Sequence, residues 1–129
     1  MMSLKKMNRN LFLFSFFKIP LIACCFPKVT HYSKKKLTIQ IPLNWMTRNH
    51  LKSMYFGALC IGADLTGAFA ALLYIRQKGY AMSFVFKDVQ AKFLKRVEGN
   101  AIFICNEIAE IHAFIDSTAQ SDCRQNKTV

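Results

Sequence analysis

The residues best suited to chemistry lie at the start and in the middle of one long apolar stretch. Asp64 is the first acidic residue of the chain, and the residues around it are almost all apolar. Such surroundings raise the pKa of a carboxyl group, which suits a base. Gly57, at the start of the stretch, lets a ligand approach the backbone closely. These two residues predict a base and a place where a carbonyl group is polarised.

The spacing of Gly57 and Asp64 limits what they can do together. If the stretch is a helix, its first turn has unpaired N–H groups and a partial positive charge, which stabilise a carbonyl oxygen as it becomes an oxyanion. Asp64 lies seven residues after Gly57, almost two turns, so both share one face. The same spacing separates them by about 10 Å along the axis, too far to act on one carbonyl. One helix alone therefore cannot form the site.

Two polar residues precede this stretch. Asn49 and His50 lie in the polar segment 44–50, which predicts a loop. Asn49 suits either a site residue or a loop and helix-capping role. His50 is a candidate base, but a loop histidine is more often structural or exposed. Five cysteines without CxxC spacing predict reduced thiols and no metal site.

Composition and charge narrow the classes of protein. The chain has 129 residues, room for one domain, and its 53% hydrophobic content excludes a disordered chain. The net charge is +11, and residues 1–63 contain no Asp or Glu. A basic first half predicts an anionic partner: nucleic acid, a lipid surface or a phosphorylated ligand. Solvated lysines are the alternative, and no nucleic-acid-binding motif is present, so we expect no nucleic acid.

The first 35 residues predict a basic and apolar helical segment outside the main domain, which we place at 36–129. Basic residues followed by a short apolar run are similar to a secretion signal, but no small-residue cleavage site follows. The segment is better interpreted as an amphipathic or core-covering helix that ends near Pro27. A peripheral membrane contact is the alternative.

The rest of the chain predicts a sheet and helices. Residues 36–41 alternate as a strand, and 54–78 are one long helix that ends at Gly79. Residues 55–75 are also long enough to span a bilayer, although Asp64 is costly there. Alternation that shifts by one residue predicts a bulged strand over 82–93.

A third, buried strand (101–105) and a helix (107–120) complete this order. Together the elements predict an α+β fold in which an antiparallel sheet curls around one central helix.

Three motifs resemble the hotdog-fold thioesterases, especially the phenylacetate-pathway type and a branch known only as a domain of unknown function. Asn49 precedes the helix at the family's spacing, and residues 57–64 (G-A-L-C-I-G-A-D) are similar to the family's helix start. Residues 93–95 (F-L-K), followed by 98–100 (E-G-N), resemble its strand and turn. The chain departs from the family in having Phe56 before Gly57, where glycine is usual, and in lacking further strands. The resemblance therefore implies a hotdog fold that ends before it is complete.

The resemblance also implies a function and a site. It implies a cytoplasmic homodimer or homotetramer that binds an acyl-coenzyme A and hydrolyses its thioester, with coenzyme A as part of the substrate and no further cofactor. Asp64 of one subunit would be general base or nucleophile, facing Gly57 as oxyanion donor and Asn49 as positioner in the other. The residues expected to bind substrate are Tyr55, Phe56, Ser83, Lys95 and Arg96. Two alternatives remain: a non-catalytic hotdog module that binds acyl chains or a protein, and a small basic membrane protein.

Overall fold

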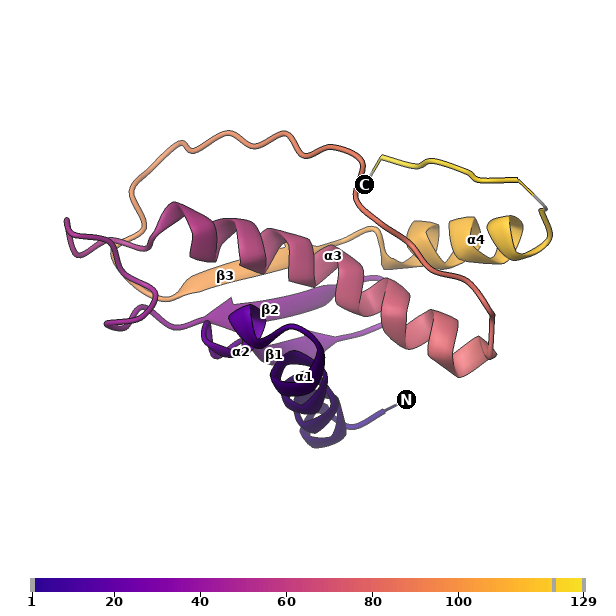
Figure 1. Cartoon of the computed structure of the whole chain (residues 1–129), viewed down its shortest axis with the longest axis horizontal. Coiled ribbons are helices and arrows are strands. Elements are labelled where there is room, and N and C mark those ends of the chain that lie inside the picture. Colours follow the sequence, from indigo (N-terminus) through magenta and orange to yellow (C-terminus); the bar gives the residue numbers. More distant parts are fainter. Residues whose placement is uncertain (1, 122, 129) are drawn as a thin grey trace.

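The computed structural model describes residues 2–121 and 123–128, and in it a long helix crosses a three-stranded antiparallel sheet (Figure 1). The elements in chain order are α1 (Leu4–Lys18), α2 (Pro20–Ala23), β1 (Lys28–Tyr32), β2 (Leu37–Ile41), α3 (Phe56–Lys78), β3 (Ala101–Cys105) and α4 (Ile108–Ala119). The fold is therefore a mixed α+β fold, as the sequence predicts. The expected long helix, the strand at 101–105 and the last helix form within two residues of their predicted bounds.

The sheet has β2 in its centre, with β1 and β3 on either side. Leu37, Ile39 and Ile41 of β2 are fully buried, because alternate side chains of a strand point to one face and α3 covers that face. Strand β3 pairs with β2 in continuous antiparallel register from Leu37 opposite Cys105 to Ile41 opposite Ala101. The sheet thus provides the surface on which α3 is positioned.

Helix α3 packs against β2, β3 and α4. Phe69 and Leu65 are at most 2% exposed, and the ring of Phe103 from β3 lies against Gly62. The helix ends at Gly79, whose φ of 70° is the left-handed conformation that glycine adopts without strain. Length and composition alone would also allow α3 to cross a membrane, since its most apolar window has a mean hydropathy of 1.8. In this structure one side of the helix packs on the sheet and α4, while its other side, which includes Cys60 and Asp64, is exposed.

The N-terminal segment contains one strand that the sequence analysis did not predict. Helix α1 buries Met7 and Leu11 against the core, and the side-chain amide of Asn8 both donates to the Val29 carbonyl and accepts from the Val29 N–H. These two hydrogen bonds dock α1 on β1. Residues 28–32 therefore belong to the same sheet as β2, within the segment expected to be helical.

The bulged strand expected over residues 82–93 does not form, so this prediction was wrong. The connection from Tyr80 to Asn100 contains no strand and leads back along α3 to the start of β3 (Figure 1). Alternation is a local signal, whereas a strand needs a neighbour for its backbone, and the described residues supply none. Exposed apolar side chains such as Val85 and Leu94 line the connection.

The expectation of a fully buried third strand is also corrected. Only one face of β3 is covered: Ala101 is buried, whereas Ile102 and Ile104 are more than half exposed on the face away from α3. An A-I-F-I-C run is consistent with burial on both faces or on one, and its composition does not distinguish the two cases.

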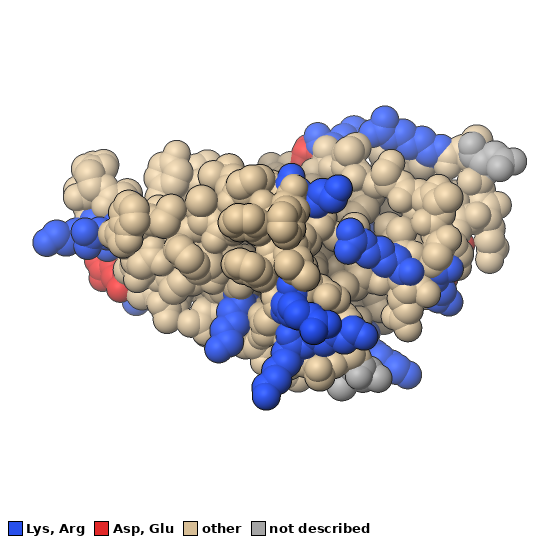
Figure 2. Space-filling view, turned by 60° about the horizontal axis from the view of Figure 1, so that its bottom comes forward, with Lys and Arg blue, Asp and Glu red and all other residues tan. Residues whose placement is uncertain are grey.

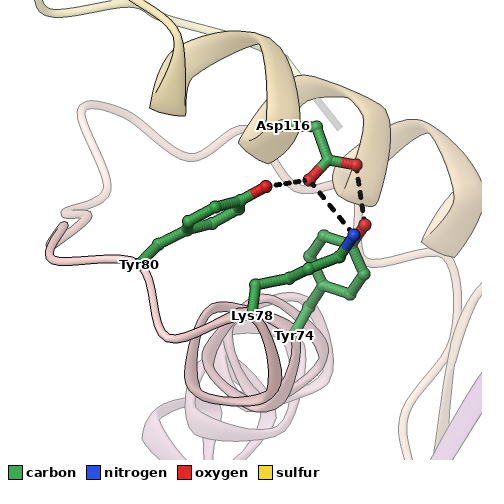
Figure 3. A network of polar contacts seen from close by, with 4 residues as sticks. All are labelled: Tyr74, Lys78, Tyr80 and Asp116. Carbon is green, nitrogen blue, oxygen red and sulfur yellow. Dashed lines mark hydrogen bonds and ion pairs between the residues drawn. The ribbon is translucent and has the colours of Figure 1, made fainter.

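A carboxylate holds α4 against the end of α3 (Figure 3). The hydroxyl of Tyr74 donates to Asp116 Oδ2 at 2.7 Å, that of Tyr80 donates to Oδ1 at 2.8 Å, and Lys78 Nζ lies 4.0 Å from the same carboxylate. The His112 ring also stacks on Tyr74 with 3.8 Å between ring centroids. These contacts fix the C-terminal helix to the long helix that carries Asp64.

Candidate functional site

A pocket of about 400 Å³ lies at the start of α3. It is formed by two segments that are far apart in the sequence, one leading into α3 and one leading into β3. Its lining residues are Asn49, Ser53, Met54, Phe56, Leu59, Phe93, Leu94, Lys95, Arg96 and Val97. The wall is thus apolar, with an amide, a hydroxyl and two cations around it, a composition typical of small-molecule sites.

Backbone and aromatic contacts hold the two walls together. The Met54 N–H donates to the Val97 carbonyl at 2.8 Å, which fixes the second segment beside the start of the helix. The rings of Phe56 and Phe93 meet across the pocket with 5.3 Å between centroids and a 57° tilt. Both rings are more than half exposed, so they stand at the mouth of the pocket rather than in the core.

Asn49 organises the loop on one side of the pocket. Its Oδ1 accepts hydrogen bonds from the N–H groups of Leu51 and Ser53, and its Nδ2 lies 3.0 Å from the Ser53 hydroxyl. An Asn side chain that bonds to the backbone two residues ahead is typical of a tight turn. The contacts of Asn49 are therefore those of a loop residue, which is one of the two roles expected from the sequence. Asn49 also lies beside the pocket.

The first turn of α3 presents free backbone donors. Tyr55 precedes the helix in an extended conformation and provides no side-chain cap. Within the described part of the chain, the N–H groups of Phe56 and Gly57 donate to no acceptor, while those of Ala58 and Leu59 both bond to the Tyr55 carbonyl. Two unpaired amides at the positive end of a helix of 23 residues attract a developing negative charge.

Gly57 is approached on one side by an aromatic ring. A side chain at this position would collide with Cε1 of Tyr55 and meet its Cδ1 at 3.0 Å. Tyr55 is itself 57% exposed, so the ring beside the glycine borders solvent. Because Gly57 has no side chain, the ring can lie against the helix start.

Asp64 lies on the outward face of α3, about two turns beyond the pocket. Its neighbours on this face are small: Cys60, Ala63 and Gly67. Partial burial raises the pKa of the Asp64 carboxyl above its ordinary value. Among the described residues it has no hydrogen-bond or ion-pair partner. The group is thus a carboxylate with a raised pKa on a surface that another chain or a ligand can approach closely.

The structure brings together some of the predicted site residues and separates others. Asn49, Phe56, Lys95 and Arg96 line the pocket, and Tyr55 and Gly57 adjoin it at the start of α3. The separated residues are Ser83, which is exposed in the connection between α3 and β3, and Asp64, which lies about 10 Å along the helix from Gly57. His50 is exposed and does not line the pocket.

The sequence analysis missed the apolar wall of the pocket. Phe93, Leu94 and Val97 line it although they were expected in or beside a strand. Leu94 is 92% exposed, so its side chain borders solvent as well as the pocket. The F-L-K motif marks this position in the sequence, but the Met54–Val97 hydrogen bond and the Phe56–Phe93 ring contact place it at the helix start. The described residues contain no group of three or more potential metal ligands.

Comparisons with known proteins agree with this architecture. The family described as "Domain of unknown function (DUF4442)" matches residues 8–120, from α1 to α4. No curated protein sequence matches the chain. A protein of unknown function from Chlorobaculum tepidum has a similar structure, with a TM-score of 0.76 and 18% identity over 92% of this chain and 73% of its own.

Two further solved structures have the same arrangement of elements. A thioesterase candidate from Shewanella oneidensis has a TM-score of 0.66 and 18% identity, over 74% of this chain and 70% of its own. A structural-genomics protein has a TM-score of 0.59 and 13% identity, over 80% of this chain and 74% of its own. At these identities the likeness shows a shared fold alone, which is consistent with the hotdog-like fold that the resemblance in the sequence implies.

Proposed function

This chain belongs to the DUF4442 family, and we propose that it binds an acyl-coenzyme A and hydrolyses its thioester at a site completed by a second copy of the chain. The observation that carries the proposal is the pocket at the start of α3, where an apolar wall and two cations lie next to a helix start whose first two amides are free. The similar fold of a thioesterase candidate supports the same reaction class.

The pocket offers a separate place for each part of the substrate. Lys95 and Arg96 are exposed at its rim, where they would pair with the phosphates of coenzyme A. The apolar wall formed by Leu59, Phe93 and Val97 would hold the first carbons of the acyl group. The thioester then lies between them, next to the start of α3.

The free amides of α3 would stabilise the transition state. When water attacks the thioester carbon, the carbonyl oxygen becomes an oxyanion, and the free N–H groups of Phe56 and Gly57 would donate to it. Preorganised donors of this kind typically contribute about 10²–10³-fold to the rate. The glycine allows the carbonyl to come close to the backbone.

The base must come from another copy. Asp64 and Gly57 of one chain are about 10 Å apart along α3, so they cannot act on the same carbonyl. The small residues around Asp64 allow a second α3 to pack closely on this face, which would place Asp64 of one copy opposite Gly57 of the other. The raised pKa of Asp64 suits a general base.

The reaction then balances without any further group. Asp64 takes a proton from water while the water oxygen forms a bond to the thioester carbon. The C–S bond breaks as the oxyanion collapses, and the proton passes to the leaving thiolate. The products are a carboxylic acid, which ionises at neutral pH, and free coenzyme A.

One observation favours a second function, binding without turnover. The rings of Phe56 and Phe93 meet across the mouth of the pocket, and Asn49 is engaged by its own loop. These contacts narrow the approach to the Gly57 amide. A non-catalytic module would bind the acyl-coenzyme A or its acyl chain in the same pocket and release it unchanged.

The experiment that tests the proposed function measures free thiol released from acetyl-, hexanoyl- and phenylacetyl-coenzyme A by the purified chain. Wild type and Asp64→Asn are compared, with Asp88→Asn as the matched control in the exposed connection. Turnover that Asp64→Asn abolishes and Asp88→Asn retains supports the proposal. Binding of acyl-coenzyme A by calorimetry without turnover supports the non-catalytic module, and neither binding nor turnover contradicts both.

A further inference from the structure

The outward face of the N-terminal helices is apolar in its second half. The buried positions of α1 are Met7, Leu11 and Ser15, four residues apart, so they form the stripe that faces the core. The remaining face, which we call the aromatic face, consists of Phe12, Leu13, Phe16, Phe17 and Leu21. Each of these side chains is at least 45% exposed, and Phe17 is 72% exposed.

The side chains of the aromatic face form a continuous surface. The rings of Phe12 and Phe16 stack with 5.9 Å between centroids, and those of Phe16 and Phe17 meet edge to face at 5.2 Å. Three adjoining exposed phenylalanines are unusual for a surface that faces only water, and such patches mark interaction sites.

The charges next to the aromatic face are all positive. Lys5, Lys6 and Arg9 occupy the first turns of the same helix, and Lys18 ends it. Residues 1–63 contain no acid to neutralise them. In Figure 2 the blue side chains gather on the face turned to the viewer, whereas red ones are visible only near its margins. The apolar surface thus lies beside an uncompensated basic one.

A shallow groove beside α1 is also lined by aromatic and basic side chains. It has a volume of about 810 Å³ and is lined by Phe12 and Phe26, together with Lys5 and Lys28. Phe26 has a φ of 50°, in the left-handed region, and its side chain is 55% exposed. This backbone conformation costs roughly 1–3 kcal/mol at a residue other than glycine. Such strained residues are typical of functional surfaces.

From these observations we propose that the aromatic face and its lysines dock the protein on the surface of an anionic phospholipid bilayer. The phenylalanines enter the boundary between headgroups and acyl chains, and Lys5, Lys6 and Arg9 contact the headgroup phosphates. Basic residues next to exposed aromatic ones are complementary to a surface that has anionic headgroups above acyl chains. The protein lies on the membrane rather than across it, because α3 packs against β2, β3 and α4.

Vesicle flotation of the full chain tests the proposal. We expect the protein to float with vesicles of phosphatidylcholine mixed with phosphatidylserine, to stay behind with phosphatidylcholine alone, and to be released by high salt. Phe16→Ser combined with Phe17→Ser should abolish flotation. These two side chains are exposed, so the fold should be retained, which circular dichroism checks.

Two double variants with the same change in net charge distinguish binding by this surface from a general effect of net charge. Lys5→Glu with Lys6→Glu and Lys87→Glu with Lys92→Glu change the charge equally, but the second pair lies in the connection on the far side of α3 from α1 (Figure 1). The first pair should weaken binding by roughly tenfold or more, and the second should leave it nearly unchanged.

Three outcomes would overturn the proposal. They are failure to float with anionic vesicles, equal loss in both charge pairs, and flotation that persists at high salt as for a membrane-spanning helix. Light scattering on wild type and the Phe16→Ser, Phe17→Ser variant adds a fourth. If the variant dissociates from a larger assembly, the aromatic face is an interface between copies instead.

Discussion

The ring of Phe103 in β3 lies directly against Gly62 of α3, so that a side chain at position 62 would overlap the ring. Glycine at this position lets α3 approach the sheet closely where β3 crosses it. We expect Gly62→Ala to lower the free energy of unfolding by roughly 1–3 kcal/mol, because either the ring or the helix must move. Urea denaturation followed by circular dichroism measures the change.

Gly67 of the same helix provides the control. A side chain at position 67 meets nothing within 4 Å inside one copy, so in a single copy Gly67→Ala should increase stability by about 0.5–1 kcal/mol through helix propensity, a gain that close packing of a second α3 on this face would reduce. Replacing Phe103 by Leu should recover part of the loss in Gly62→Ala. Equal effects of the two alanine substitutions would show that the close packing of Phe103 on Gly62 is absent.

The Asp116 network predicts how stability changes at low pH. Hydrogen bonds from Tyr74 and Tyr80 lower the pKa of the Asp116 carboxyl. The folded protein therefore binds this proton less readily than the unfolded chain, and the network stabilises the fold above the ordinary Asp pKa. This stabilisation is lost as the pH falls through the lowered pKa. Melting temperatures of wild type and Asp116→Asn should converge in acid and differ at neutral pH, with the variant lower.

The two tyrosines predict a second change at high pH. Hydrogen bonding to Asp116 raises the pKa of both Tyr74 and Tyr80, so the folded protein keeps their protons longer than the unfolded chain. Their stabilisation is present below the ordinary tyrosine pKa of about 10 and is lost as the pH rises through the raised values. In a pH titration followed by tyrosinate absorbance, fewer tyrosines should ionise above the ordinary tyrosine pKa in Asp116→Asn than in wild type. An unchanged titration would contradict the network.

Opening the mouth of the pocket should raise activity. Phe56→Ala removes the ring that meets Phe93 while keeping the backbone amide of residue 56. We expect kcat/KM for an acyl-coenzyme A to increase severalfold, because the Gly57 amide becomes accessible. Trp45→Ala, which removes another exposed aromatic side chain that does not line the pocket, is the control. A fall in kcat/KM confined to Phe56→Ala would show that the ring binds substrate rather than obstructing it.

The raised pKa of Asp64 should affect both the pH dependence of the rate and the stability of the fold. As a base with a raised pKa, it should give a rate that increases with pH through a value above the ordinary Asp pKa, and Asp64→Asn should lower kcat by roughly 10²–10⁴-fold. Its raised pKa also means that ionisation opposes folding, so Asp64→Asn should be slightly more stable than wild type at neutral pH. Loss of activity together with loss of stability would indicate a structural role instead.

The elements predicted correctly are those with strong local signals. The apolar run before Gly79 and the helical spacing of Ile108, Ile111 and Ile115 are properties of single segments, and the corresponding helices form. The hydrogen bonds from Tyr74 and Tyr80 to Asp116 span 42 and 36 positions of the sequence, and no local pattern indicates them.

Errors arose where pairing decides the structure. Residues 82–93 alternate as a strand does, yet the described residues offer no strand beside them. Residues 28–32 lie in the segment 1–35 expected to be helical, but Val29, Thr30 and Tyr32 favour a strand, and β1 forms because β2 pairs with it. The residue types around Gly57 indicated the first wall of the site. The second wall depends on long-range contacts, the Met54–Val97 hydrogen bond and the Phe56–Phe93 ring contact, which no local pattern predicts.

The measurement that tests the central claim most directly is complementation between two inactive variants. Asp64→Asn lacks the base, and Lys95→Glu combined with Arg96→Glu lacks the proposed phosphate contacts; all three residues are exposed. If each site takes Asp64 from one copy and the pocket from the other, mixing and re-equilibrating the variants creates dimers with one intact site. The account predicts recovery of about a quarter of wild-type thioester hydrolysis, since about half of the dimers are mixed and each has one of two sites intact. A mixture as inactive as its components, while light scattering shows that mixed dimers form, would contradict it.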